Sequence, residues 1–261
     1  MAVEITANST DRVSYGDIAR IAGLTGISIA ITVKLTATPV AEDTWVQQWG
    51  PTPSTNETFL LGAQGAGDEV GFITGGGSAA ERYGLRTTGV NLVNGGLYRV
   101  LATWGPTDTV FIWVNGVNEA TETWLDGATP FSALLDSPEA VEVGYSSVTG
   151  TSAWTPGGQF SEFAIWDHVV PAWVARKYGL GHSPEMYTKG GIIYDPLYRG
   201  DFPSRNLWGK REVGARTGTK TAPHPNMVST DDSLIVLVPP YATISGSVVP
   251  TVTEALVQAG V

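Results

Sequence analysis

The stretch that decides the fold is residues 98–117, which read YRVLATWGPTDTVFIWVNGV. Two apolar runs are separated by Pro106-Thr107-Asp108, and a second turn signal, Asn115-Gly116, closes the second run. This pattern predicts two antiparallel strands joined by a short turn. Gly116 is expected to adopt a positive φ, which a branched side chain would penalise.

The second strand of this hairpin, residues 110–114, is apolar at every position. Successive side chains of a strand point to opposite faces of its sheet, so one face of this strand should line a core. The other face needs cover from a loop, a helix or a partner, and the sequence leaves all three open.

Residues 158–181, GQFSEFAIWDHVVPAWVARKYGLG, predict one strand followed by a short helix. Pro171 suits the first turn of that helix, where its missing N–H group costs no hydrogen bond. Trp173 and Tyr178 are expected to dock the helix back on the sheet.

Short strands recur along the rest of the chain. Residues 27–35 alternate apolar and polar side chains without a break, as a strand with one face in a core does. Further strands are expected at 45–49, 57–62, 69–74, 83–87 and 140–145. Many short strands separated by Gly-rich turns predict an all-β, antiparallel sandwich.

The order of these signals resembles the laminin-G-like branch of the concanavalin A-like lectin/glucanase jelly rolls. The hairpin resembles that branch's Y/W-x-V-A-x-x-W/Y…V-x-V-N-G pattern, and residues 158–181 resemble its strand and helix. The resemblance implies a jelly-roll sandwich over residues 24–180. It leaves a lead-in strand at 1–23 and a C-terminal extended arm or small β extension at 181–261. Glu162 occupies the acidic strand position of that branch, where a hydrogen bond with a loop backbone is expected.

Charge is unevenly distributed along the chain. The net charge is −10, yet residues 176–225 hold nine basic and four acidic residues. An acidic body argues against nucleic acid as a partner, because phosphate contacts need Lys and Arg. The basic segment is either a docking strip for an acidic neighbour or an ordinary solvated loop. Its candidate docking residues are Arg199, Arg205, Lys210, Arg211, Arg216 and Lys220.

Several sequence features bear on where the protein works. No apolar run approaches the roughly 18 residues that cross a bilayer, and no secretory signal is visible, so no membrane partner is expected. The absence of cysteine favours a protein made in a reducing cytoplasm. The spacing from Tyr194-x-Pro196-Leu197 to His224-Pro225 resembles the tail that follows such jelly rolls in tailed-bacteriophage structural proteins.

These features predict a non-enzymatic bacteriophage virion structural protein, a capsid decoration (cement) or head-appendage subunit made in the host bacterial cytoplasm. Its expected partners are further copies of itself and the major capsid protein or another virion protein. A homo-oligomer is expected, and a trimer would suit a capsid lattice. The alternative is a carbohydrate-binding module or phage adhesin that contacts host-surface glycans.

The sequence lacks the usual signatures of catalysis. Glucanases of this fold carry E-x-D-x-x-E or E-x-D-x-E on one strand, which places the carboxylates on one face. The nearest pair, Glu139 and Glu142, lacks the central Asp and is expected to be exposed. The three histidines, His168, His182 and His224, have no zinc-ligand spacing. We therefore expect no enzymatic activity and no catalytic residue.

Binding residues can be nominated only as candidates. A sugar site needs an exposed aromatic side chain beside polar groups, and Trp124 with Asp126, and Trp154, fall in expected loops. Packing in a core or an interface would also explain these tryptophans. No cofactor is expected, although calcium remains open because lectin-like domains bind it at loop ends. The candidate calcium ligands are Asp68, Asp126 and Asp136.

Overall fold

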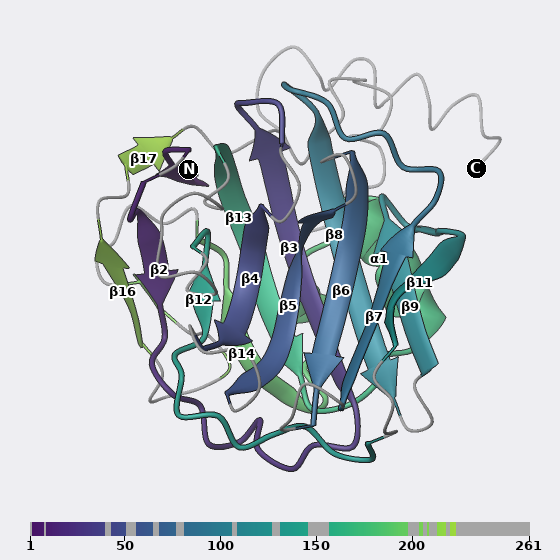
Figure 1. Cartoon of the computed structure of the whole chain (residues 1–261). Helices are drawn as coiled ribbons and strands as arrows, with labels where there is room; N and C mark the ends of the chain where they lie inside the picture. The colour runs from purple at the N-terminus through teal and green to yellow at the C-terminus, as the bar shows by residue number, and fades with distance from the viewer. Residues whose placement is uncertain are drawn as a thin grey trace, which may run out of the picture. The chain divides into compact units, whose positions relative to one another are not determined.

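The structure is a computed structural model in which two antiparallel sheets pack face to face (Figure 1). It describes residues 2–7, 9–39, 43–50, 56–64, 68–76, 81–105, 109–126, 131–145, 157–197, 204–205, 208, 213–217 and 220–222. All described residues belong to one compact unit, residues 1–225. The predicted all-β antiparallel sandwich is confirmed.

The sheet that we call the back sheet has eight described strands. Their order is β10 (Val117–Asn118), β9 (Thr109–Val114), β8 (Leu97–Gly105), β3 (Ile27–Leu35), β13 (Gly158–Trp166), β1 (Ala2–Ile5) and β17 (Lys220–Ala222), and β14 (Gly191–Asp195) also pairs with β13. The predicted hairpin is β8 and β9, with Val100 opposite Val114 and Gly105 opposite Thr109. Its first turn, residues 106–108, lies outside the described residues.

The front sheet has nine described strands. Their order is β11 (Thr121–Asp126), β7 (Arg82–Thr87), β6 (Glu69–Gly75), β5 (Glu57–Gln64), β4 (Thr44–Trp49), β12 (Glu142–Val143), β2 (Arg12–Ser14), β16 (Val213–Thr217) and β15 (Ser204–Arg205). The meander from β4 to β7 is built from neighbouring strands, as the short turns between them require.

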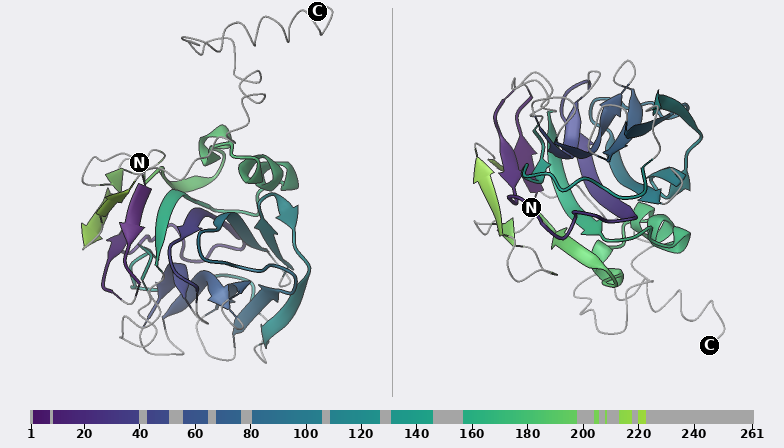
Figure 2. Two further views of the ribbon diagram at one scale, coloured as in Figure 1. Left: turned by 90° about the horizontal axis from the view of Figure 1, so that it is seen from above. Right: turned by 60° about the horizontal axis from the view of Figure 1, so that its bottom comes forward.

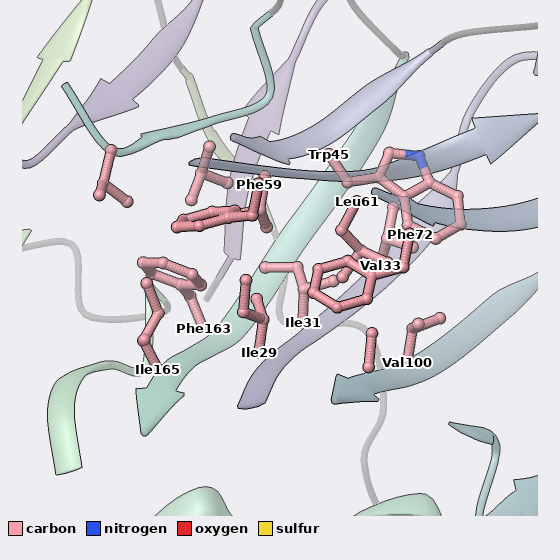
Figure 3. Close-up of a cluster of buried hydrophobic side chains, with 14 of the residues drawn as sticks. Ile29, Ile31, Val33, Trp45, Phe59, Leu61, Phe72, Val100, Phe163 and Ile165 are labelled. Carbon is pink, nitrogen blue, oxygen red and sulfur yellow. The ribbon is translucent and has the colours of Figure 1, made fainter. Parts of the chain in front are cut away.

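The core lies between the two sheets. Figure 3 shows Trp45, Phe59, Leu61 and Phe72 of the front sheet facing apolar side chains of the back sheet, and all of these side chains are buried. At one end of the sandwich, Trp104 stacks on Phe131, with ring centroids 5.0 Å apart.

The outer face of the back sheet is covered by α1 (Ala172–Gly179) and the short 3-10 helix η3 (Pro184–Met186), as Figure 2 shows. Helix α1 starts directly after Pro171, as predicted. Tyr178, Val174 and Ala175 are buried against back-sheet residues such as Leu101 and Trp113. A helix therefore covers Trp113, on the second apolar face of β9. No helix in the described part of the chain is long and apolar enough to cross a membrane.

The turn after β9 has the predicted conformation. Asn115 has a φ of 49° and Gly116 a φ of 82°, the left-handed values of a two-residue hairpin turn. Gly116 also lies against the end of α1, where a Cβ on it would stand 3.1 Å from the carbonyl oxygen of Arg176. Both the backbone conformation and the close approach therefore favour glycine at this position.

Both ends of the described chain take part in the sheets. β1 pairs with β17, with Val3 opposite Thr221, and β2 pairs with β16, with Val13 opposite Arg216. β14 pairs with the second half of β13, where Ile193 lies opposite Ile165. Strands before residue 24 and after residue 180 are thus hydrogen-bonded to strands of the central segment.

Candidate functional site

The outer face of the front sheet carries an apolar group that we call the front-face cluster: Trp49, Leu60, Ile73, Trp124 and Leu125. The first three side chains are buried, and the two from β11 are partly buried. The pairing of β11 with β7 shifts between Thr123 and Leu125. This irregularity lets two successive residues, Trp124 and Leu125, join one cluster, which strict alternation would forbid.

An ion pair borders the front-face cluster. Arg82 binds the buried carboxylate of Glu57 with two parallel hydrogen bonds, from Nε and Nη2. The Arg82 guanidinium also lies 5.7 Å from the centroid of the Trp49 ring. Such a fork fixes the orientation of the cation beside the aromatic group. Arg82 keeps 19% of its side chain exposed, so a ligand on this face could reach it.

A second polar group lies across the same sheet, on β12, β4 and β2. Gln47 donates to Glu142 Oε2 over 3.1 Å, and Arg12 lies 3.2 Å from Glu142 Oε1. The pKa of Glu142 is raised, because the effect of burial is larger than the opposing effect of Arg12. The expectation that Glu142 is exposed is wrong, because partners from two other strands allow its carboxylate to be buried.

Three further carboxylates of this side are also compensated. Asn56 donates to Glu139 Oε1 over 3.1 Å. Arg86 bridges Glu122, at 2.5 Å, and Glu69, at 3.4 Å. Carboxylates held in this way by cations and amides present fixed hydrogen-bonding groups, which suits the recognition of a polar ligand.

The predicted sugar-binding residues lie partly within this face. Trp124 lies in strand β11 rather than in a loop and contributes to the front-face cluster. Asp126 ends the same strand, with its backbone opposite Tyr83, and its side chain is outside the described part. Trp154 also lies outside the described residues.

The three candidate calcium ligands are not gathered in one place. Asp68 precedes β6 at the end where Glu69 pairs with Gln64. Asp126 pairs with Tyr83, which itself pairs with Thr74 near the other end of β6. Six residues of strand separate Asp68 from Thr74, the position level with Asp126. At 3.3 Å per residue this is about 20 Å, so Asp68 and Asp126 cannot ligate one ion. Asp136 is exposed, and the described residues contain no group of three or more potential metal ligands.

The basic docking candidates lie in the C-terminal segment. Arg205 lies in β15, Arg216 in β16 and Lys220 in β17, three strands at one lateral edge of the sandwich. Their side chains, and all of Arg199, Lys210 and Arg211, fall outside the described part. The docking role of these residues stays a prediction.

Glu162 lies at an irregularity of β13, where the pairing with β3 shifts between Ser161 and Ala164. It has a φ of 55° and is buried. The hydroxyl of Tyr194 donates to Glu162 Oε2 over 3.1 Å, so the carboxyl bonds a side chain instead of the predicted loop backbone. Burial raises the pKa of Glu162 to about 7, despite the opposing hydrogen bond from Tyr194.

Trp173 does not have the role that the sequence predicts. The sequence predicts that Trp173 docks α1 on the sheet, but 48% of it is exposed, while Tyr178 is buried as predicted. The periodicity of the helix explains why Trp173 is exposed. At 100° per residue, Val174, Ala175 and Tyr178 share one side of α1, and Trp173 points about 150° away from the centre of that side.

Comparison with known proteins places the fold. No family model and no curated protein matches the sequence. A Bacteroides ovatus protein described as carbohydrate-binding matches with a TM-score of 0.57 and 17% identity, over 84% of this chain and 59% of its own. The CBM40 module of a Ruminococcus gnavus sialidase, bound to α2,6-sialyllactose, matches with a TM-score of 0.51 and 17% identity, over 69% of this chain and 97% of its own. The chain therefore shares its jelly-roll fold with carbohydrate-binding proteins and spans less than two thirds of the Bacteroides chain.

Proposed function

We propose that this chain is a non-catalytic glycan-binding domain whose ligand lies on the outer face of the front sheet. The observation that carries the proposal is the partly buried Trp124 in the front-face cluster, on a face where Arg82 and Glu57 form a fixed ion pair. The carbohydrate-binding proteins that share the fold support the same proposal.

The chemistry of this face suits a sugar. A pyranose ring has an apolar side that packs on an indole, and hydroxyl groups at its rim that need donors and acceptors. Trp124 and Leu125 would supply the apolar surface, and the Arg82 guanidinium would donate to a hydroxyl or carboxylate. Because Glu57 and Trp49 fix Arg82 from two sides, little side-chain freedom would be lost on binding.

We further propose that the domain acts on a bacteriophage particle, as a capsid decoration or head-appendage subunit. The phage-like spacing of residues 194–225 and the segregated charge support this assignment. The position of β15, β16 and β17 at one edge of the sandwich would set the basic segment against an acidic neighbour, another copy of the chain or the major capsid protein.

A glycan array tests the first proposal. The wild-type chain should bind a restricted set of glycans, Trp124→Ala should abolish that binding, and Trp124→Phe should retain part of it because phenylalanine keeps an aromatic face. Repeating the array with a calcium chelator shows whether the ion takes part. Glycan binding that Trp124→Ala leaves unchanged would move the ligand away from this face.

The copy number in purified phage particles, measured by quantitative mass spectrometry against the major capsid protein, tests the second. Hundreds of copies would identify a capsid decoration, and a handful would indicate a vertex or tail appendage. Absence of the protein from the particles would reject the virion assignment and leave the glycan-binding proposal standing.

A further inference from the structure

Trp173 is a second aromatic surface, far from the front-face cluster in the fold because it lies on α1, outside the back sheet. With 48% of its surface exposed, it exceeds every other tryptophan in the described part of the chain. The helix that carries it is anchored through Val174, Ala175 and Tyr178, so Trp173 itself is not required to hold α1 on the sheet.

Although exposed, the Trp173 ring is held in place. Tyr187 packs against it edge to face, with ring centroids 5.7 Å apart and an interplanar angle of 84°. The backbone of Tyr187 is in turn fixed by Trp166, whose indole N–H donates to the Tyr187 carbonyl oxygen over 2.8 Å. An exposed aromatic group with restricted motion is what a stacking ligand requires, because little side-chain entropy is lost on binding.

Two side-chain hydrogen bonds connect Tyr187 to His168 and His168 to Asp167. The Tyr187 hydroxyl lies 3.1 Å from His168 Nε2, and His168 Nδ1 lies 2.9 Å from Asp167 Oδ1. Gly190, at a φ of +66°, makes room for this pair, since a Cβ there would stand 2.1 Å from Asp167 Oδ1 and 2.4 Å from His168 Nδ1. The backbone at Gly190 is therefore shaped around the two side chains.

This series of hydrogen bonds leaves accepting capacity on the oxygens of Tyr187 and Asp167. In neutral histidine one ring nitrogen donates and the other accepts. With Nδ1 donating to Asp167, Nε2 accepts from the Tyr187 hydroxyl, and the remaining capacity of the Tyr187 oxygen and of the second Asp167 oxygen is for accepting. The side chains of His168 and Asp167 are 31% and 37% exposed, and the ring of Tyr187 lies between His168 and Trp173 in the series of ring contacts.

We propose that Trp173, Tyr187, His168 and Asp167 form a second sugar-binding site, which takes a neutral pyranose such as a hexose or N-acetylhexosamine residue. The sugar ring stacks on Trp173, and its hydroxyls donate to Tyr187 and Asp167. The Asp167 carboxylate disfavours an acidic sugar through like-charge repulsion. Lys177, one helical turn from Trp173, and Lys189, next to Gly190, are neighbouring groups that would favour an acidic sugar instead.

This site goes beyond the proposed function and stands apart from it, because it shares no residue with the front-face cluster. Two sites on opposite sheets would let one domain contact a branched or repeated glycan at two points. Linked sites raise the overall affinity without any new contact, provided that one glycan can span them.

The test is nuclear magnetic resonance of the full chain with 15N-labelled tryptophan, because each indole gives one N–H signal. The Trp173 signal is assigned with Trp173→Phe. The probes are cellotriose, mannotriose and N-acetylchitotriose as neutral sugars, and 6′-sialyllactose as the acidic one. We expect a saturable shift of the Trp173 signal with a neutral probe, and roughly ten-fold weaker binding in Tyr187→Phe, which loses one acceptor.

Trp124→Ala is the matched control and should leave this shift unchanged. A shift of the Trp124 signal alone would support the proposed function and overturn the second site. A Trp173 shift with 6′-sialyllactose alone would overturn the neutral-sugar assignment, and no Trp173 shift with any probe would overturn the site altogether. Trp173→Ala should melt at nearly the wild-type temperature, because the residue is half exposed.

Discussion

Gly179, the last residue of α1, lies directly against Gly116 in the turn between β9 and β10. A Cβ on Gly179 would stand 1.9 Å from the backbone nitrogen of Gly116 and 2.3 Å from the carbonyl carbon of Asn115. Two elements more than 60 positions apart in the chain thus meet backbone to backbone, and a side chain on Gly179 would clash at the contact. This contact fixes the helix to the hairpin that the sequence predicts most clearly.

Gly179→Ala should therefore destabilise the protein by about 1–3 kcal/mol, because the added methyl group meets backbone atoms that cannot rotate away. Gly116→Val should also lower the melting temperature, because a branched side chain is unfavourable at the positive φ of this position. Gly89→Ala is the control, as no atom lies within 4 Å of its Cβ position. Thermal unfolding followed by circular dichroism measures all three. A Gly179→Ala variant as stable as Gly89→Ala would argue against the contact.

Glu162 should make stability depend on pH. Its folded-state pKa is raised from 4.5 to about 7 by burial, so its contribution to stability is fully present below about pH 4.5 and is lost as the pH rises through 7. The loss amounts to roughly 3 kcal/mol at 1.4 kcal/mol per pKa unit. Glu162→Gln, which cannot ionise and can still accept from Tyr194, should remove this part of the pH dependence.

Urea unfolding of the wild type and of Glu162→Gln between pH 4 and pH 9 tests this expectation. The difference between the two unfolding free energies should grow in favour of the variant as the pH rises. Glu142, whose pKa is also raised, leaves some slope in both proteins. Asp17→Asn, at an exposed carboxylate far along the chain from Glu162, is the control. Parallel pH profiles for the wild type and Glu162→Gln would show that Glu162 is already ionised in the folded protein below neutral pH.

Removal of the C-terminal segment should have a sharply position-dependent effect. A chain of residues 1–225 keeps every described residue and should unfold cooperatively. A chain of residues 1–180 loses β14, whose Ile192, Ile193 and Tyr194 are at most 1% exposed. It also loses Asp195, which accepts a 2.9 Å hydrogen bond from Tyr15.

Each of these buried apolar side chains contributes about 1.5–3 kcal/mol, so their sum approaches the whole stability of a typical domain. Residues 1–180 should therefore fail to fold. Circular dichroism melting curves and dispersion of the amide proton spectrum compare the two chains. A sharp melting transition in the shorter chain would show that β14 is dispensable.

The ion pair between Arg82 and Glu57 should be costly to break from one side. Arg82→Leu leaves the Glu57 carboxylate buried without its cation, a change that costs about 3–5 kcal/mol in comparable buried pairs. The double variant Arg82→Leu with Glu57→Gln should recover much of this loss. A double-mutant cycle with urea unfolding measures the coupling free energy between Arg82 and Glu57. Additive losses would mean that the two groups do not interact in solution.

The sequence predicts best where local pattern and structure coincide. The hairpin of β8 and β9, the turn at Gly116 and the start of α1 after Pro171 each follow from residues next to one another in the chain. The burial of Glu142 does not, because Gln47 and Arg12 come from strands about 95 and 130 positions away. The position of Trp124 in the cluster depends on an irregular pairing of β11 with β7, which no alternation pattern contains.

The candidate sites show the same division. Residue type nominates a tryptophan, but exposure decides whether it can bind a ligand, and exposure follows from which side of an element faces the protein. For Trp173 the helical period held that information. For Trp124 it came from the neighbouring strands, and for Asp68 and Asp126 only the register of β6, β7 and β11 reveals that they lie at opposite ends of one sheet.

The pairing of Ala2 with Ala222 also has a consequence for synthesis of the chain. Strand β1 leaves the ribosome some 220 residues before its partner β17. At 5–20 residues per second that delay is on the order of 10–40 seconds. During this time the free edge of β1 is open to chaperones or to a neighbouring nascent chain. The sandwich can therefore be completed only after the segment from β14 to β17 has emerged.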